Sequence, residues 1–401
     1  MLRTLALFVF ALNAQAGPSM ETYLSQVSQL TSAHRAANAR LSTPANATAD
    51  ALLAGGRFFL SSMQNRAWFY EGIGRAGAIM QTLQFDVWIT VRGGDVVWLN
   101  YTAATYQSAL DVSASLKSQN VMVVAFGPQP PAGRPPFPYW VDSLTPWNAE
   151  DNFVLLGNVL SLWSMEGELA AATARHGKSL VYWQGILVPG GPARNALYTD
   201  RLFHDGFPSM QPVKEGTMSA AFMNTACGTF AQITDSELPQ IAAAAQKVAQ
   251  RRATGNRTPL VVTSHLLPFI NLENSPFFQY LTDPAQVDAA IAQSGFLVNF
   301  GYSGVDLDLW RKVRLAKATA VWITGELPNQ TDFSGRSDIL IDQHWQFGDA
   351  SVVAPGYDVR LLPQSGIAQL FIYELLTKAA AEPQQPFVSN GKFHSLFHCG
   401  L

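Results

Sequence analysis

Hydroxyl-bearing residues recur in this sequence at the points where apolar, strand-like runs end and helical patterns begin. These residues are Ser61, Ser62, Thr102, Thr105, Thr263, Ser264, Ser303 and the neighbouring Gly304. The first N–H groups of a helix carry a partial positive charge and can hold an anion, to which hydroxyl groups add hydrogen bonds. Open α/β sheets bind their ligands outside the carboxyl ends of the strands. We therefore predict that these residues bind the substrate.

A second set of candidate residues lies in the segment 178–216, which is rich in glycine and proline. It carries Arg194, Arg201 and His204. Loops of this length are usually functional or disordered, and this one holds too many aromatic residues for disorder. Two interpretations stay open. The segment is either a solvated connection, or a loop that closes over the substrate while Arg194 or Arg201 binds an anion.

Three short motifs match known nucleotide or nucleophile sites only in part. Residues 72–77 fit G-x-G-x-x-G, but the preceding strand-like run ends near Ser62, too early for a dinucleotide-binding turn. Close packing within a helix is the favoured interpretation of these glycines. Residues 177–179 match the end of the P-loop motif, but the first glycine of that motif is missing because position 172 is Ala. Residues 301–305 resemble a nucleophile elbow with Val305 at its last position, and the sequence identifies no His partner.

The C-terminal tail holds a weak metal-binding pattern. His394 and His398 are four residues apart and Cys399 follows, which could form part of a zinc site. A tail without a third clear ligand is more often simply a tail. We therefore predict no metal and no cofactor.

The apolar runs that precede these residues predict an α/β fold in two halves. In the first half we expect strands at 57–62, 95–100, 121–126 and 139–142, with helices at 68–81, 106–117 and 155–175. In the second half we expect strands at 259–264, 295–300 and 320–324, with helices at 240–251 and 305–317. Strand centres at 59, 98 and 123 recur at 261, 298 and 322, as a duplicated module requires. The prediction is two three-layer α-β-α modules with parallel sheets, at 17–235 and 236–385, followed by a tail at 386–401.

Composition and charge exclude several classes of protein. The chain has 401 residues, of which 48% are hydrophobic and 14% charged, so it is not intrinsically disordered. A formal net charge of -3 gives no general attraction to nucleic acid. The two cysteines, Cys227 and Cys399, are too few for a disulfide-rich scaffold or a zinc site with four cysteine ligands.

The first residues have the pattern of a secretory signal. Arg3 precedes an apolar run from residue 5 to residue 12, and residues 14–16 read Ala-Gln-Ala, a small-residue cleavage site. The apolar run is too short to span a bilayer, and no other stretch is apolar enough. We expect a signal peptide at 1–16 and an exported protein that begins at Gly17. The alternative is translation from Met20, which would leave the protein in the cytoplasm.

Both halves resemble sugar isomerase (SIS) domains, a flavodoxin-like family that binds phosphosugars. The resemblance is carried by residues 56–62, by Glu71 with the glycines after it, by the turns at 100–105 and 301–304, and by residues 338–365. It implies that Glu71 is the catalytic base, and His204 is added as a second catalytic candidate from its setting. The chain departs from the family where Tyr101 and Tyr302 replace small residues, and where Ala103 and Ala104 replace a Ser-Gly pair.

Several functions stay open at this stage. One is a sugar-binding or phosphosugar-binding protein with aldose–ketose isomerase activity, in which Glu71 moves a proton between adjacent carbons. Another is a non-catalytic sugar sensor, which the depleted Ser/Thr turns slightly favour. A Rossmann-type oxidoreductase is the third. The expected partners are a small sugar or sugar phosphate and, in a homo-oligomer, further copies of the chain.

Overall fold

The computed structural model describes residues 19–382 except 87, 205, 207, 264–271, 273 and 326–337, together with residues 396, 397 and 399. The predicted signal peptide, His394 and His398 therefore lie outside the described residues. None of the described helices combines the length and apolar character that crossing a bilayer requires.

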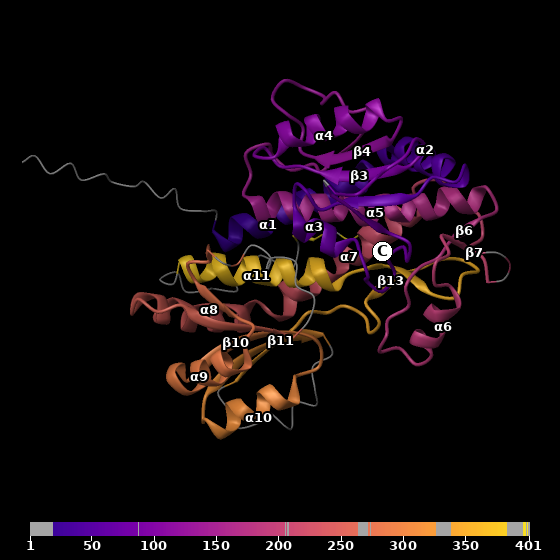
Figure 1. Cartoon of the computed structure of the whole chain (residues 1–401). Coiled ribbons are helices and arrows are strands. Elements are labelled where there is room, and N and C mark those ends of the chain that lie inside the picture. The colour runs from indigo at the N-terminus through magenta and orange to yellow at the C-terminus, as the bar shows by residue number, and fades with distance from the viewer. Residues whose placement is uncertain are drawn as a thin grey trace, which may run out of the picture.

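The chain forms two five-stranded sheets in which every strand pair is parallel (Figure 1). The first sheet contains β1 (Phe58–Ser61), β2 (Leu83–Phe85), β3 (Val96–Asn100), β4 (Met122–Gly127) and β5 (Tyr139–Asp142). The second contains β8 (Thr258–Thr263), β9 (Phe278–Leu281), β10 (Phe296–Ser303), β11 (Thr319–Gly325) and β12 (Ile339–Asp342). The spatial orders are β2-β1-β3-β4-β5 and β9-β8-β10-β11-β12, the same flavodoxin-like order in both sheets. The predicted fold class, α/β with two parallel-sheet modules, is confirmed.

The duplication extends to a turn of the same kind, which follows the last strand of each sheet. Asp142 ends β5 and Asp342 ends β12, and each side chain accepts the backbone N–H two residues further on, at 2.9 Å and 2.8 Å. The residues that donate, Leu144 and His344, both have left-handed backbones, with φ of 57° and 53°. Such angles are uncommon outside glycine. Their recurrence at matching places supports a common module.

Helices cover both faces of each sheet. Figure 1 shows α4 on the outer face of the first sheet, and α9 and α10 on the outer face of the second. Between the two sheets lie α1, α2, α5, α7, α8 and α11. The bounds are α1 (Met20–Ala36), η1 (Asn38–Leu41), α2 (Ser42–Leu53), α3 (Arg66–Glu71), α4 (Tyr106–Ser118), α5 (Asp151–Arg175), α7 (Thr217–Ser236), α8 (Leu238–Ala253), α9 (Pro284–Ser294), α10 (Leu307–Leu315) and α11 (Ser365–Ala381).

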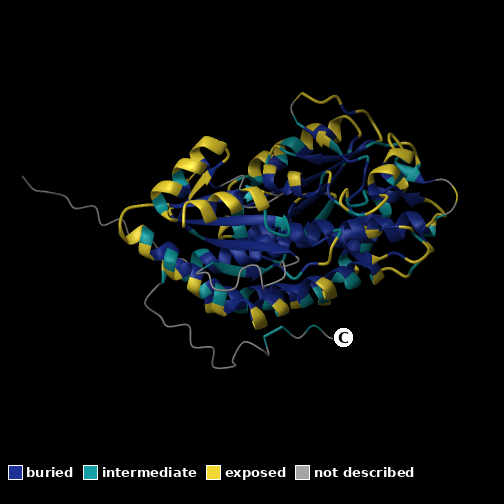
Figure 2. Cartoon of the chain, turned by 90° about the horizontal axis from the view of Figure 1, so that it is seen from below, coloured by how far each residue is buried: buried dark blue, intermediate teal, exposed yellow. Residues whose placement is uncertain are grey.

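The helix α5 forms the centre of the molecule. All of its residues from Phe153 to Ala174 are buried, as expected for a helix that is covered on every side. One continuous apolar core runs from Trp98 in the first sheet, past Trp163 of α5, to Phe300 in the second sheet. In Figure 2 this interior is buried, and the exposed residues lie on the outer helices and loops.

The helix predicted over residues 68–81 is wrong in its extent. The helix α3 ends at Glu71, and a series of turns follows in which Gly74 and Gly77 have positive φ. A Cβ at Gly77 would lie 2.6 Å from Ala350 Cβ. The glycines therefore permit close packing, as predicted, but they do so in turns that contact the later strand β13 (Ala350–Val353) rather than inside a helix.

The segment 178–216 contains regular structure that the sequence did not indicate. The strands β6 (Ser179–Leu180) and β7 (Phe203–His204) pair antiparallel, and α6 (Gly191–Leu197) lies between them. Near the C-terminus, β13 (Ala350–Val353) and β14 (Arg360–Pro363) form a second antiparallel pair.

The described part of the C-terminal tail is attached to the helices between the sheets. Cys399 forms a disulfide with Cys227 of α7. Ser28 donates a hydrogen bond to the carbonyl of Leu396 (2.5 Å), and the Phe397 ring packs near Phe230. The Cys399 thiol is therefore not available to a metal. Within the described part of the chain, no cluster of His, Cys, Asp and Glu could hold a metal ion.

Candidate functional site

A cleft of about 740 Å³ lies at the carboxyl edge of the first sheet, and we call it the first-sheet cleft. Its walls come from the turns after β1 and β3, the start of α5, the segment that precedes β9, and one side of α11. Groups from both modules therefore form one cleft, at the position where open α/β sheets bind ligands.

Three of the predicted substrate-binding residues, Ser62, Thr102 and Thr105, line this cleft together. Ser61 is buried behind them. Its hydroxyl donates to Gln64 Oε1 (2.8 Å) and accepts the N–H of Met63 (3.3 Å). The first half of the predicted set is thus brought to one place, although Ser61 supports the wall rather than forming it.

The opposite wall carries charged side chains that the sequence analysis did not select. Lys378 of α11 forms an ion pair with Glu150, and its Nζ lies 3.6 Å from Glu374 Oε2. Asn152 Nδ2 donates to Glu374 Oε1 at 2.6 Å. Burial raises the pKa of Glu374, while the bonds from Asn152 and Lys378 oppose that rise. Asp151 and Arg66, both exposed, complete the charged lining.

Polar atoms without a partner among the described residues lie in the lining of the cleft and at the end of β3. The Gln64 Nε2 is buried and has no hydrogen-bond partner among the described residues, and Gln64 lines the cleft. The amide of Asn100, at the carboxyl end of β3, likewise has no partner within the described part of the chain. Buried polar groups are nearly always hydrogen-bonded in native proteins. A ligand or bound water in the cleft would satisfy Gln64.

A second cavity, of about 420 Å³, lies at the carboxyl edge of the second sheet, and we call it the second-sheet cavity. Thr263 and Tyr302 reach it from the ends of β8 and β10, and Arg75, Trp183 and Asp349 add to its lining. Each module contributes a segment to the cavity of the other. Residues 274–277 line the first-sheet cleft, and residues 74–76 line the second-sheet cavity.

The remaining predicted residues of the second half lie near this cavity or outside the described chain. Ser303 is half-buried at the end of β10, and Gly304 follows it with φ of 68°. Ser264 lies outside the described residues. Of the predicted substrate-binding residues, Ser62, Thr102 and Thr105 therefore line the first-sheet cleft, and Thr263 lines the second-sheet cavity.

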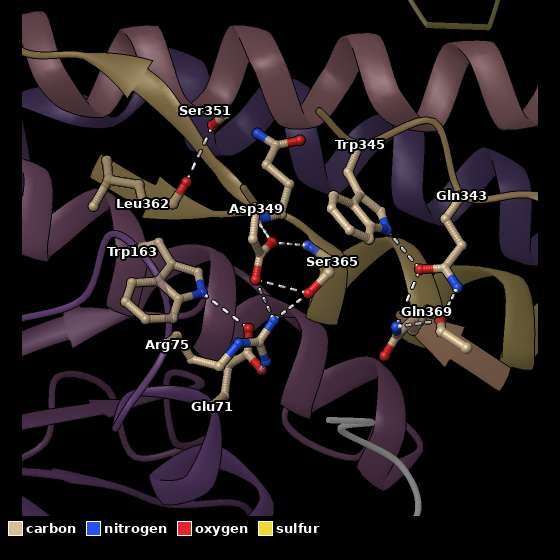
Figure 3. A network of polar contacts seen from close by, with 12 residues as sticks. Glu71, Arg75, Trp163, Gln343, Trp345, Asp349, Ser351, Leu362, Ser365 and Gln369 are labelled. Carbon is tan, nitrogen blue, oxygen red and sulfur yellow. Dashed lines mark hydrogen bonds and ion pairs between the residues drawn. The ribbon is translucent and has the colours of Figure 1, made fainter. Parts of the chain in front are cut away.

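Glu71, the predicted base, is buried in a polar network between the two modules (Figure 3). Arg75 pairs with Glu71 on one side and with Asp349 (3.0 Å) on the other, and it also donates to Ser365. The Trp163 indole donates to Glu71 Oε1 at 3.3 Å. Burial raises the pKa of Glu71, although Arg75 opposes the rise.

The backbone of α11 encloses the Glu71 carboxylate. A Cβ at Gly366 would overlap both carboxylate oxygens of Glu71. Asp349 in turn accepts the N–H groups of Gln364 (2.9 Å) and Ser365 (2.7 Å) at the start of α11. The network therefore joins the turn after α3 to the first turn of α11, and its geometry leaves no room for a substrate at Glu71.

The candidates from the segment 178–216 form a cluster of their own. Arg194 forms an ion pair with Asp358 (3.0 Å) and donates to the Tyr357 hydroxyl (3.2 Å). His204 Nε2 lies 2.6 Å from the Tyr198 hydroxyl, and Arg201 is exposed after α6. These contacts attach the segment to the connection between β13 and β14. None of the three residues lines the first-sheet cleft or the second-sheet cavity as described above.

The sequence did contain a signal for the residues that were missed. Glu374 and Lys378 are four residues apart in an otherwise apolar helix, so a charged pair faces one side of α11. Buried charges in such a helix need partners, and charged side chains with such partners often line the wall of a ligand-binding cavity. Asn152 and Asp349 carried no comparable signal, because their roles depend on contacts with α11.

Comparisons with known proteins identify the fold. No protein-family model matches the sequence, and no curated protein sequence matches it. The C-terminal domain of glucosamine-fructose-6-phosphate aminotransferase from Francisella tularensis is similar, with a TM-score of 0.53 and 8% identity, over 90% of this chain and 94% of that chain. At this identity the likeness concerns the fold alone, and the fold implied by the resemblance to tandem sugar isomerase domains is confirmed.

Two further solved structures are similar over most of the chain. A candidate phosphosugar isomerase from Clostridium difficile 630 has a TM-score of 0.49 and 8% identity, over 93% of this chain and 97% of that chain. A candidate sugar-binding protein from Salmonella typhimurium LT2 has a TM-score of 0.47 and 12% identity, over 90% of this chain and 98% of that chain.

Proposed function

We propose that this protein binds a sugar or a sugar derivative in the first-sheet cleft. The observation that carries the proposal is the cleft itself. Hydroxyl, amide and carboxylate groups from both modules converge there, beside the buried Gln64 Nε2, which lacks a partner among the described residues. Sugars are bound through many directed hydrogen bonds, which such a lining can supply. The name of the Francisella tularensis protein, which has a similar fold, refers to sugar phosphates and agrees with this ligand class.

The geometry favours binding over isomerisation by Glu71. A general base must come within hydrogen-bond reach of the proton that it removes. The Glu71 carboxylate is paired with Arg75 and covered by Gly366, so a sensor or binding protein is the better-supported function.

Isomerase activity is the second candidate, and one observation favours it. Glu374 lines the cleft, and burial raises its pKa, as is often found for catalytic acids and bases. If the protein is an isomerase, Glu374→Gln should abolish aldose–ketose conversion while sugar binding persists. Conversion that survives this substitution would remove Glu374 as the base.

Binding can be tested by filling the cleft. Ala104 is exposed and lines the cleft, so Ala104→Trp should occupy the ligand position at little cost to folding. Ala292→Trp, at an exposed position on α9, is the matched control. Calorimetric titration with hexoses, amino sugars and hexose phosphates should give binding to the wild type and to Ala292→Trp. Binding to Ala104→Trp should be lost or weakened by more than about tenfold, which corresponds to about 1.4 kcal/mol. Equal binding by all three proteins would refute the assignment of the cleft.

We further propose that the protein is exported. The bond between Cys227 and Cys399 supports this, because structural disulfides persist mainly in oxidising compartments. N-terminal sequencing of the native protein should find Gly17 first, and mass spectrometry without reductant should find no free thiol. A chain that starts at Met20 with two free thiols would contradict export.

A further inference from the structure

The first-sheet cleft offers a phosphate group few side-chain hydroxyl donors. The Ser61 hydroxyl donates to Gln64, and the Ser62 hydroxyl donates to the carbonyl of Phe85 (3.4 Å). Ala103 and Ala104, in the turn after β3, have no hydroxyl group. Two of the four hydroxyls predicted for this half are thus committed within the chain, and phosphate recognition through a hydroxyl-rich turn is weakened.

Carboxylates outnumber cations on the opposite wall. Glu150, Asp151 and Glu374 line the cleft, against Arg66 and Lys378. The Lys378 ammonium is held between Glu150 and Glu374, so these three paired groups together keep a net negative charge. Glu150 and Asp151 also stand at the N-terminus of α5, where they offset the partial positive charge of that helix end.

The most buried of the paired charges on this wall is an acceptor rather than a donor. The Glu374 side chain is 5% exposed, against 11% for Lys378 and 41% for Glu150. Electrostatic interactions are strongest where water is excluded. A dianionic phosphate near Glu374 would therefore be repelled, whereas a protonated amine would be attracted and could donate to the carboxylate.

We propose, on the basis of the sugar-binding function above, that the ligand of the first-sheet cleft is a sugar with a free protonated amine and no phosphate group. The amine donates to Glu374 beside the existing bond from Asn152. The ring hydroxyls bond to Thr102 and to Gln64 Nε2, which has no partner among the described residues. These are separate observations: the hydrogen bonds of Ser61 and Ser62 argue against a phosphate group, and the charge of the wall argues for an amine.

The test is a calorimetric titration with matched hexose derivatives. The probes are glucosamine, galactosamine and mannosamine, their N-acetyl forms, their 6-phosphates, and the parent hexoses. At least one amino sugar should bind more than about tenfold tighter than its N-acetyl form, which corresponds to about 1.4 kcal/mol. The 6-phosphate of that amino sugar should bind more weakly than the amino sugar itself. A 6-phosphate that binds tighter than the free amino sugar would overturn the proposal.

Substitutions of Glu374 and Asp151 on the opposite wall test whether the charge of these side chains, rather than their shape, selects the ligand. Glu374→Gln keeps the side-chain volume and should bring the ratio of amine to N-acetyl affinity close to one, with the affinity for N-acetyl forms nearly unchanged. Asp151→Asn, at an exposed position, should lower the same ratio by a smaller factor and provides a second readout if Glu374→Gln does not fold. Asp308→Asn on the distant helix α10 is the control and should leave the ratio as in the wild type. An unchanged ratio in both cleft variants would refute the role of the wall.

The outcomes distinguish this inference from the function on which it rests. If no probe binds, or if Ala104→Trp binds as the wild type does, sugar binding in this cleft is refuted. If parent hexoses or N-acetyl sugars bind as tightly as amino sugars, and Ala104→Trp no longer binds them, sugar binding in the cleft stands. The selection for an amine is then refuted.

Discussion

Arg75 is the only described cation in contact with Glu71 and Asp349, and all three side chains are buried between the modules. Buried charges lose their hydration, so hydrogen bonds from the protein must replace it. Trp163 donates to Glu71, and the hydroxyl and N–H groups of Ser365 donate to Asp349. At the scale of single residues, the burial of Glu71 is therefore explained by its partners, which come from both modules.

Replacing Arg75 should destabilise the protein strongly. Arg75→Met keeps the length of the side chain but leaves two buried carboxylates without their cation, which typically costs about 3–5 kcal/mol. Urea unfolding followed by circular dichroism measures this difference. Arg311→Met is the control, because the Arg311–Asp308 pair is exposed and should contribute less than about 1 kcal/mol. A loss at Arg75 no larger than at Arg311 would contradict the structural role.

Gly366 allows the backbone of α11 to approach the Glu71 carboxylate. Gly366→Ala should force the two apart and cost about 1–3 kcal/mol, as overpacking of an interior does. Gly228→Ala in α7 is a matched control, since a Cβ there meets no atom within 4 Å. That control should be neutral or stabilise by up to about 1 kcal/mol, because alanine favours helices over glycine. Thermal unfolding of both variants decides the matter, and equal melting temperatures would argue against close packing at Gly366.

Contacts with neighbouring elements fix both ends of the helix α7, which lies between the two sheets. Glu168 of α5 accepts the N–H groups of Gly216 (2.8 Å) and Ser219 (3.0 Å) and so satisfies the buried start of α7. At the other end of α7, Glu237 bonds to His344 Nε2 (2.9 Å) and to the N–H of Asp342 (3.2 Å). The junction of α7 and α8 is thereby fastened to the carboxyl end of β12.

The contact between His344 and Glu237 should make stability depend on pH. Burial lowers the pKa of His344, but the hydrogen bond to Glu237 and the nearby Asp342 outweigh burial and raise the pKa overall. A pKa that is higher in the folded state stabilises the fold below the pKa of unfolded histidine, about 6.5, and this contribution is lost as pH rises through the folded value.

The substitution His344→Asn tests this dependence. Asparagine tolerates the left-handed backbone at this position, so the variant removes the charge without added strain. The wild type should be more stable than the variant by about 1 kcal/mol near pH 5.5, and the difference should vanish near pH 9. Urea midpoints at both pH values measure it. A difference that grows with pH would show that the sign of the effect is wrong.

Across the whole molecule, the disulfide closes a long loop. Cys227 and Cys399 are 172 residues apart, and their bond holds the end of the chain against α7. Bonds across long loops restrict the unfolded chain and typically contribute about 2–4 kcal/mol. Reductant should therefore lower the melting temperature of the wild type and leave the double variant Cys227→Ala/Cys399→Ala unaffected. An equal response of both proteins would show that the bond contributes no stability.

The fold class and the duplication could be predicted from the amino-acid sequence. Central strands of parallel sheets are buried on both faces, so β3, β4, β10 and β11 are continuous apolar runs that can be recognised locally. Their spacing then indicated two modules. Of the residues expected to bind a ligand at the carboxyl ends of the strands, Ser62, Thr102, Thr105 and Thr263 line a cavity. The edge strands β2 and β9 were missed, because they are only three and four residues long and half exposed, without a clear pattern.

Which of these residues share a cavity depends on the packing of the folded chain. The first-sheet cleft is completed by residues 274–277 and by α11, and the second-sheet cavity by residues 74–76, so each depends on how the modules pack. The role of Glu71 was decided in the same way: the Arg75 beside it pairs with Asp349, which is 274 positions further along the chain. Local periodicity reports which face of an element is buried, but not which distant charge is buried against it. Desolvation and pairing across the module interface set those roles, and they exist only once the chain has folded.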